Sequence, residues 1–163
     1  MGTGKTTVGR GLAVRLELPF ADTDAILEER YGPIAQQFAE QGEAVFRARE
    51  HAIVVELCAR GPMVIATGGG AWVDPRNRRA LATCCVRVVL HAPLAILRQR
   101  LGDAPGRPLW EEAESLLAAR EPAYADADLR IDVEGRSPEA IVEGIVVAMG
   151  QHGWLAGHRD GPQ

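Results

Sequence analysis

The stretch Met1-Gly2-Thr3-Gly4-Lys5-Thr6-Thr7 opens the chain and matches the second half of a phosphate-binding loop. In the pattern G-x-x-x-x-G-K-[S/T], small residues let backbone N–H groups close on phosphate oxygens. The lysine then reaches the terminal phosphates and the hydroxyl holds Mg²⁺. Gly4, Lys5 and Thr6 supply the last three positions. The leading glycine of the pattern would precede Met1.

Two further features favour a nucleotide-phosphate site at this stretch. Lys5 is the only lysine among 18 Lys and Arg residues, so a compact ammonium stands where a planar guanidinium would not fit a phosphate cradle. The apolar residues that follow recur at helical spacing up to Pro19. They are Val8, Leu12, Ala13 and Leu16. The predicted helix therefore points its positive N-terminus at the anion.

Length and composition indicate one domain with a sizeable core, since the chain has 163 residues of which 47% are hydrophobic. We expect this domain over residues 1–150 and a flexible tail over 151–163. The net charge of −4 argues against nucleic acid as a partner. No apolar run approaches the roughly 20 residues that span a bilayer, and no signal peptide is evident, so we expect no membrane partner.

Three cysteines, Cys58, Cys84 and Cys85, are odd in number and do not have metal-ligand spacing. We expect them to be reduced in a cytoplasmic protein. The adjacent pair is interpreted as small apolar residues ahead of a strand.

Two carboxylates flank a threonine in Asp22-Thr23-Asp24, after a short extended segment. At the end of a strand, residues i and i+2 point to the same side. One carboxylate could then lie beside a metal and the other face a substrate hydroxyl. The alternative, that Asp24 is the N-cap of the helix that follows, is compatible with this interpretation.

Helices are predicted over residues 24–30, 33–40 and 43–59, with breaks at Gly32 and Gly42. In the last of them Glu43, Arg47 and Glu50 share one face, which is typical of a solvated ladder of ion pairs.

A short apolar run over residues 63–67 predicts a buried parallel strand that ends in Gly68-Gly69-Gly70. Ligands bind at the carboxyl ends of such strands. The three glycines either form a sharp turn or let backbone N–H groups approach a ligand, and we favour the second. Asp74-Pro75 predicts the N-cap and first residue of a helix that runs to about Leu81.

The remaining pattern alternates in the same way. Strands are predicted over 86–90 and 129–133, and helices over 93–101, 109–120 (ending before Pro122) and 138–147, the last capped by Ser137. Residues 102–108 are rich in Gly and Pro and predict a mobile loop that could bring Arg107 onto a transferring phosphate. The alternation predicts an α/β fold of three layers with a central parallel sheet.

In order, these motifs resemble the shikimate kinase family over Gly2 to about Val147. The resemblance rests on six motifs at family-like spacing. They are Gly2-Thr3-Gly4-Lys5-Thr6-Thr7-Val8-Gly9-Arg10, Asp22-Thr23-Asp24, Gly42-Glu43-Ala44-Val45-Phe46-Arg47, Gly68-Gly69-Gly70, Arg107-Pro108-Leu109 and Arg120-Glu121-Pro122-Ala123-Tyr124.

The resemblance implies ATP-dependent phosphorylation of the 3-hydroxyl of shikimate by a cytoplasmic monomer of the P-loop kinase fold. It implies a substrate-binding region over about 24–59 and a lid over about 102–112. Catalytic roles fall on Lys5, Asp24 and Arg107, and metal ligation on Thr6 directly and Asp22 through water. The ATP site would comprise Gly2, Thr3, Gly4, Lys5, Thr6, Thr7, Arg100, Arg107 and Pro138. The shikimate site would comprise Asp24, Arg47, Gly68, Gly69, Gly70 and Arg120.

Two departures from the family pattern stand out. The family has a hydrophobic strand and a glycine ahead of the position that Met1 occupies here, and this strand lies between the strands predicted at 63–67 and 86–90. Without it we expect two unpaired strand edges, and we expect Met1 to be internal to the loop of a chain that starts upstream. The second departure is Trp110, where the family commonly has leucine.

Three alternatives remain open on the sequence. A gluconate kinase-like enzyme would share the phosphate loop, although the triple glycine with Arg47 and Arg120 favours an acidic ring as substrate. A nucleoside monophosphate kinase would accept a nucleotide. A non-catalytic nucleotide-binding protein would turn over no acceptor.

Overall fold

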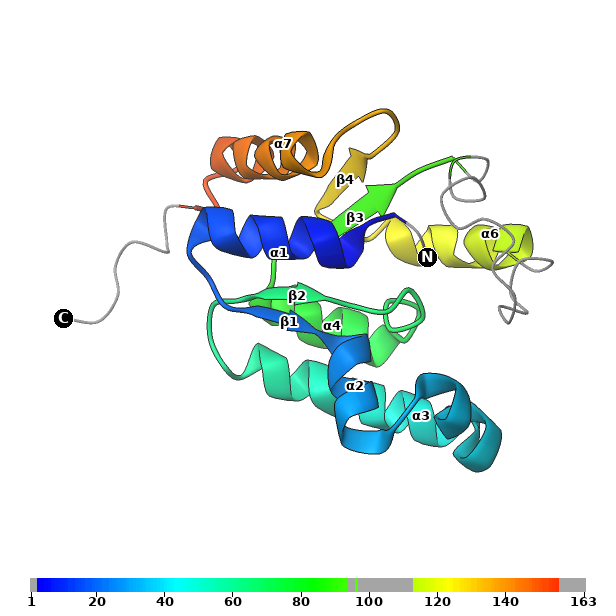
Figure 1. Cartoon of the computed structure of the whole chain (residues 1–163). Coiled ribbons are helices and arrows are strands. Elements are labelled where there is room, and N and C mark those ends of the chain that lie inside the picture. The colour runs from blue at the N-terminus through cyan, green and yellow to red at the C-terminus, as the bar shows by residue number, and fades with distance from the viewer. Residues whose placement is uncertain (1–2, 94–95, 97–112, 156–163) are drawn as a thin grey trace.

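The computed structural model describes residues 3–93, 96 and 113–155, in which helices alternate with short parallel strands (Figure 1). The helices are α1 (Lys5–Leu16), α2 (Thr23–Tyr31), α3 (Ile34–Cys58), α4 (Pro75–Cys84), α6 (Ala113–Tyr124) and α7 (Pro138–Gln151). The strands are β1 (Phe20–Asp22), β2 (Val64–Ala66), β3 (Val88–His91) and β4 (Leu129–Asp132). None of these helices is long and apolar enough to cross a membrane.

Most predicted boundaries lie within a few residues of the observed ones, and three are wrong for local reasons. Asp22, not Asp24, is the N-cap of α2. Pro122 lies inside α6 rather than after it. Helix α7 continues through Gln151, beyond the end predicted at 147, and the Trp154 amide then donates to the Met149 carbonyl at 3.0 Å. The predicted helix over 93–101 and the lid over 102–112 lie outside the described residues, apart from Pro93 and Ile96.

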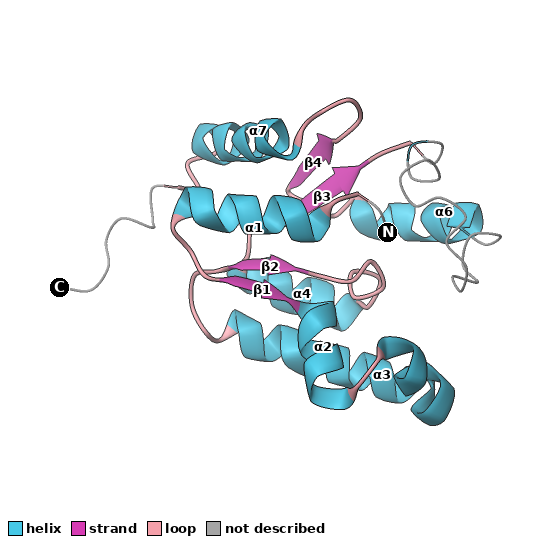
Figure 2. Ribbon diagram, viewed as in Figure 1, coloured by secondary structure: helices cyan, strands magenta, loops and turns pink. Residues whose placement is uncertain are grey.

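The described strands form two separate pairs rather than one sheet (Figure 2). β1 pairs with β2 in parallel, with Ala21 opposite Ile65. β3 pairs with β4 in parallel, with Leu90 opposite Ile131. Among these strands neither β2 nor β3 has a second partner, which agrees with the two open edges expected from the sequence.

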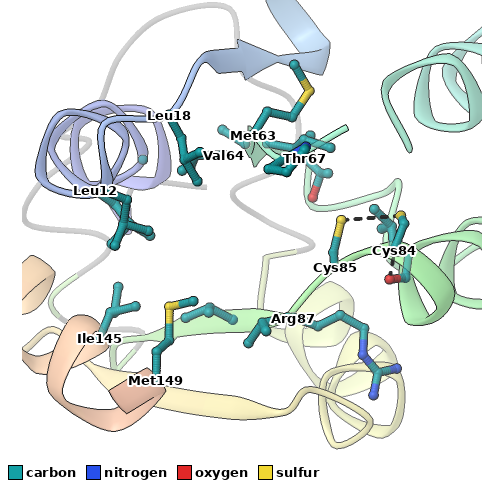
Figure 3. Close-up of a pocket in the computed structure, with 18 of the residues that line it drawn as sticks. Leu12, Leu18, Met63, Val64, Thr67, Cys84, Cys85, Arg87, Ile145 and Met149 are labelled. Atoms are coloured by element: carbon teal, nitrogen blue, oxygen red, sulfur yellow. Dashed lines mark hydrogen bonds between the residues drawn. The ribbon is translucent and has the colours of Figure 1, made fainter. Parts of the chain in front are cut away.

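A cavity of about 930 Å³ lies between the two strand pairs (Figure 3). Its walls include Val64 of β2 and Val88 of β3, with Leu12 of α1 and Ile145 of α7. The walls are largely apolar. The cavity therefore separates two halves of the molecule that are joined mainly through α1, which packs on both β2 and α7.

Each half has its own core. Helices α1 and α7 pack on β3 and β4 through a cluster that includes Leu12, Val133 and Ile145. Helices α2 and α3 pack on β1 through Leu27, Ile53 and Leu57, among others. A third cluster, with Val54, Trp72, Leu81 and Ala123, joins α3 and α4 to α6.

Candidate active site

The phosphate loop enters α1 through Gly4, whose φ of 85° lies in the left-handed region that favours glycine. Lys5 is the first residue of α1 and is half-buried. Burial lowers the pKa of its ammonium, while the nearby carboxylates of Asp24 and Asp22 act in the opposite direction. The lysine therefore lies at the helix N-terminus among acidic side chains, where an anionic phosphate would meet both a charge and free N–H groups.

Asp22 joins the phosphate loop to α2. One of its carboxylate oxygens, Oδ2, accepts a hydrogen bond of 2.7 Å from the Thr6 hydroxyl. The other, Oδ1, caps α2 by accepting from the amides of Asp24 at 3.0 Å and Ala25 at 3.4 Å. The capping bonds fix the carboxylate in place, so that its second oxygen faces the loop.

Asp24 lies in the first turn of α2 and points at the end of β2. Burial raises the pKa of its carboxyl group, and the neighbouring charge of Asp22 raises it further. Lys5 and Arg47 are close enough to lower this pKa in part. A carboxylate with a raised pKa next to cationic groups is a candidate proton acceptor.

The three glycines that follow β2 each face a different polar side chain. A Cβ atom added to Gly68 would lie 2.6 Å from Oδ1 of Asp24, and one added to Gly69 would lie 2.9 Å from Nη1 of Arg120. A Cβ atom on Gly70 would lie 2.6 Å from both terminal nitrogens of Arg47. None of the three has a positive φ. Polar side chains therefore fill the space beside all three glycines. The Ala71 and Val73 amides donate to the Gly68 and Gly70 carbonyls at 3.1 Å, so the segment also forms a turn, and the approach of glycine N–H groups to a ligand stays a prediction.

Arg47 is held by an ion-pair network on α3. Its Nη1 donates to Glu50 at 2.7 Å and its Nε to Glu43 at 3.2 Å. Glu50 is only 1% exposed, so the predicted solvated ladder is wrong at this position. The guanidinium also lies 5.2 Å from the ring centroid of Phe46 and 5.9 Å from that of Phe38. These contacts fix the fork of Arg47 beside Gly70.

Arg120 reaches Gly69 from α6, and Trp72 anchors this helix. The Trp72 indole N–H donates to the buried Ala123 carbonyl at 2.7 Å. One residue further on, the Tyr124 hydroxyl donates to the Gly69 carbonyl at 3.4 Å. Helix α6 is thus tied to the loop that begins at Gly68, although the segment before α6 is not described.

The structure brings together most of the residues predicted from the sequence. Lys5, Thr6, Asp22, Asp24, Arg47, Gly68, Gly69, Gly70 and Arg120 lie in one region. Thr3, Gly4 and Thr7 flank Lys5 along the chain. Pro138 is exposed at the start of α7, and no contact joins it to these residues among the described side chains. Gly2, Arg100 and Arg107 lie outside the described residues.

Three residues that support the site carried no role in the sequence analysis. Glu50 pairs with Arg47, and Trp72 anchors α6. Thr23 is fully buried, and its hydroxyl accepts from the Gly68 amide at 3.2 Å, so this N–H is already occupied. The spacing of Glu50 from Arg47 was visible in the sequence, but its burial depends on tertiary packing.

A phosphate loop, an acidic pair beside it and two arginines at the end of a parallel strand define a P-loop kinase of a small acidic molecule. A family profile described as shikimate kinase matches residues 1–150. The chain belongs to the shikimate kinase family.

Individual relatives agree with this assignment. The chain is 43% identical to a shikimate kinase of Geobacter sulfurreducens, over 93% of this chain and 88% of that protein. It is 42% identical to a shikimate kinase of Halorhodospira halophila, over 91% of this chain and 89% of that protein. A solved shikimate kinase of Acinetobacter baumannii in complex with shikimate superposes with a TM-score of 0.87 at 34% identity, covering 93% of this chain and 89% of that one.

A gluconokinase of Sinorhizobium meliloti superposes with a TM-score of 0.63 at 20% identity. This likeness shows the shared fold only.

Proposed function

We propose that this chain transfers the γ-phosphoryl group of ATP to the 3-hydroxyl of shikimate, in the pathway to chorismate. One observation carries the proposal: a carboxylate and two guanidinium groups meet at Gly68-Gly69-Gly70, beside the phosphate-loop lysine. A substrate with one carboxylate and neighbouring hydroxyl groups has the complementary charges. Family membership supports the same reaction.

The two arginines are proposed to bind the carboxylate of the substrate. Planar guanidinium forks match a carboxylate in bidentate fashion. Arg47 is already oriented by Glu43 and Glu50, so little side-chain freedom is lost when the substrate binds. The amides of Gly69 and Gly70 are proposed as further donors, whereas the Gly68 amide donates to Thr23.

The nucleotide is proposed to bind at the start of α1, where Lys5 would hold the β and γ phosphates. Thr3, Gly4 and Thr7 would contribute to the phosphate loop. Gly2, Arg100 and Pro138 remain predicted members of the ATP site, the last two beside the adenine. Arg107 remains the predicted lid residue that would neutralise the transferring phosphoryl group.

The residues beside the loop fit Mg²⁺, because the Thr6 hydroxyl and the Asp22 carboxylate lie 2.7 Å apart and offer only oxygen donors. Thr6 would hold the ion directly and Asp22 through water. When bound, Mg²⁺ supplies positive charge to the phosphate oxygens.

Asp24 is proposed to orient the attacked hydroxyl and to accept its proton. Phosphoryl transfer has a loose transition state, so alignment and neutralisation of charge contribute most of the rate. Asp24 at the end of β2 and Lys5 at the start of α1 would align the acceptor and the donor. The closeness of Asp24 to Gly68 supports this alignment, because a Cβ atom added to Gly68 would lie 2.6 Å from Oδ1 of Asp24.

The test is ADP release with ATP, Mg²⁺ and one of several acceptors. We expect release with shikimate and none above background with gluconate or nucleoside monophosphates. Replacement of Arg47 by Ala should raise the KM for shikimate and leave the KM for ATP nearly unchanged. Release with gluconate or with a nucleotide, or no release with any acceptor, would contradict the proposal.

We propose that the enzyme acts as a monomer in the cytoplasm, where ATP is available. Light scattering after size exclusion measures the oligomeric state directly.

A further inference from the structure

Three cysteines meet at the junction of α3, α4 and the segment that leads into β3. Cys58 is the last residue of α3, Cys84 is the last residue of α4, and Cys85 follows it. All three sulfur atoms lie within 4.8 Å of one another. The spacing in sequence did not predict this cluster, because Cys58 lies 26 residues before Cys84 and reaches it only through the packing of α3 on α4.

The cluster can take two covalent forms. In the structure Cys58 and Cys84 form a disulfide, with their Cα atoms 5.8 Å apart, and Cys85 is a free thiol. The sulfur of Cys85 lies 3.4 Å from that of Cys84, and both side chains point toward each other (Figure 3). A thiol reductant would convert the disulfide to two thiols and would itself become a disulfide. The reduced chain then presents three thiols at one point.

We propose that the reduced cysteines Cys58, Cys84 and Cys85 form a site for one thiophilic metal ion. In the tetrahedral geometry of Zn²⁺ sites, sulfur ligands about 2.3 Å from the ion lie about 3.8 Å from one another. The three sulfur atoms here lie within 4.8 Å of one another, and those of Cys84 and Cys85 are 3.4 Å apart, so the cluster is close to this spacing. Among the described residues no oxygen or imidazole ligand belongs to the cluster, and purely thiolate sites select soft ions such as Zn²⁺ or Cu⁺.

Hydrogen bonds hold the helices that carry or precede the three cysteines. The Cys85 amide donates to the Leu81 carbonyl at 2.9 Å and so fixes the end of α4. On the far side of the same interface His51 of α3 and Asn77 of α4 are joined by a hydrogen bond of 2.7 Å. Cys84 is exposed and the other two cysteines are half-buried, so an ion can enter from solvent. Binding of a divalent ion to three thiols releases three protons and leaves a complex with one negative charge.

The ion would join parts of the molecule that are otherwise weakly connected. Cys58 and Cys84 belong to helices that pack together beside β2, whereas Cys85 leads into β3. All three line the cavity between the strand pairs. A metal bound to them would therefore stabilise the wall of that cavity, far along α3 from Arg47.

The test uses Cd²⁺ as the probe, because its thiolate complexes absorb in the ultraviolet. The full chain is reduced, freed of reductant under inert gas and titrated. We expect the absorbance to saturate at one ion per chain. Each of the variants Cys58→Ser, Cys84→Ser and Cys85→Ser should weaken binding by at least tenfold. Thr83→Ala, which removes a neighbouring hydroxyl but no thiol, should bind as the parent chain does.

A second measurement serves if a variant does not fold. The parent chain is loaded with Cd²⁺, treated with iodoacetamide and examined by mass spectrometry for alkylated cysteines. Protection of all three supports the site. Protection of only two, unchanged binding in Cys85→Ser, or equal binding by the oxidised chain would each overturn it.

Discussion

Gly70 and Arg47 are so close that a single added carbon at Gly70 would lie 2.6 Å from both terminal nitrogens of Arg47. The Arg47 guanidinium thus fills the space that a side chain at position 70 would need. The same relation links Gly68 to Asp24 and Gly69 to Arg120. The loop after β2 therefore sets the position of the three polar groups proposed to contact the acceptor.

Gly70→Ala is expected to displace the Arg47 guanidinium and so to raise the KM for shikimate by about tenfold, the effect of a loss of about 1.4 kcal/mol in binding. The KM for ATP should change little. Steady-state kinetics with each substrate varied in turn measure both values. Gly150→Ala is the control, because a Cβ there would meet its nearest neighbour at 3.8 Å. Equal kinetics for both variants would show that Arg47 does not bind the substrate at this position.

Arg47→Met should destabilise the fold through Glu50. This carboxylate is buried, and burial already raises its pKa although Arg47 opposes the rise. Removal of one partner from a buried ion pair costs about 3 kcal/mol or more at neutral pH. Without Arg47 the pKa of Glu50 in the folded chain would rise further. Protonated Glu50 therefore stabilises the folded variant below the unfolded pKa of 4.5, and this stabilisation is lost as the pH rises through the folded pKa.

Urea unfolding of Arg47→Met at pH 7 and at pH 4.5 checks this expectation, with the larger deficit at pH 7. The double variant Arg47→Met, Glu50→Gln should recover most of the loss at pH 7. A deficit that is independent of pH would assign the effect to lost packing instead.

Asp24→Asn is expected to lower kcat by about 10²-fold or more, as found when a general base is removed. The same change should raise the stability at pH 7. Burial raises the pKa of Asp24 in the folded chain, so ionisation of this group destabilises the fold at neutral pH. Below the unfolded pKa of 3.8 both chains carry a neutral group and the difference should vanish. Melting temperatures at pH 7 and at pH 3.5, together with kcat, test both statements.

Trp72→Phe should weaken the attachment of α6. The change removes the indole donor from the buried Ala123 carbonyl, which keeps only the longer bond of 3.4 Å from the Asp126 amide, at a cost of about 1 kcal/mol or more. Because Arg120 lies on this helix, the KM for shikimate should rise in parallel. Tyr124→Phe removes a longer bond of 3.4 Å and should cost less than about 1 kcal/mol. A larger loss of stability in Tyr124→Phe than in Trp72→Phe would show that the tyrosine bond contributes more to the attachment of α6 than the tryptophan bond.

Much of the fold and the core of the site could be predicted from sequence because the signals are local. Asp74 and Ser137 cap their helices as expected, and the alternation of apolar strands with helices sets the fold class. Lys5, Asp24 and Arg47 were found through motifs that resemble one family. The neighbourhood of these three residues is therefore encoded in short stretches of chain.

The rest depends on packing between distant segments, which local patterns do not carry. Glu50 resembles any helical surface acid until α3 packs against its neighbours and buries it. A proline usually ends a helix, but α6 continues past Pro122. The hydrogen bond from the Trp72 indole to the Ala123 carbonyl helps to hold this last part of the helix. Cys58 meets Cys84 and Cys85 only through the contact of two helices. The domain boundaries and the roles of Arg100, Arg107 and Pro138 stay predictions.

The open edges of β2 and β3 have a consequence for the molecule in solution. Their backbone amides and carbonyls can join strands of another molecule, which is how precipitation often begins. Among the described strands these edges are unpaired, so association through them is expected to increase with protein concentration.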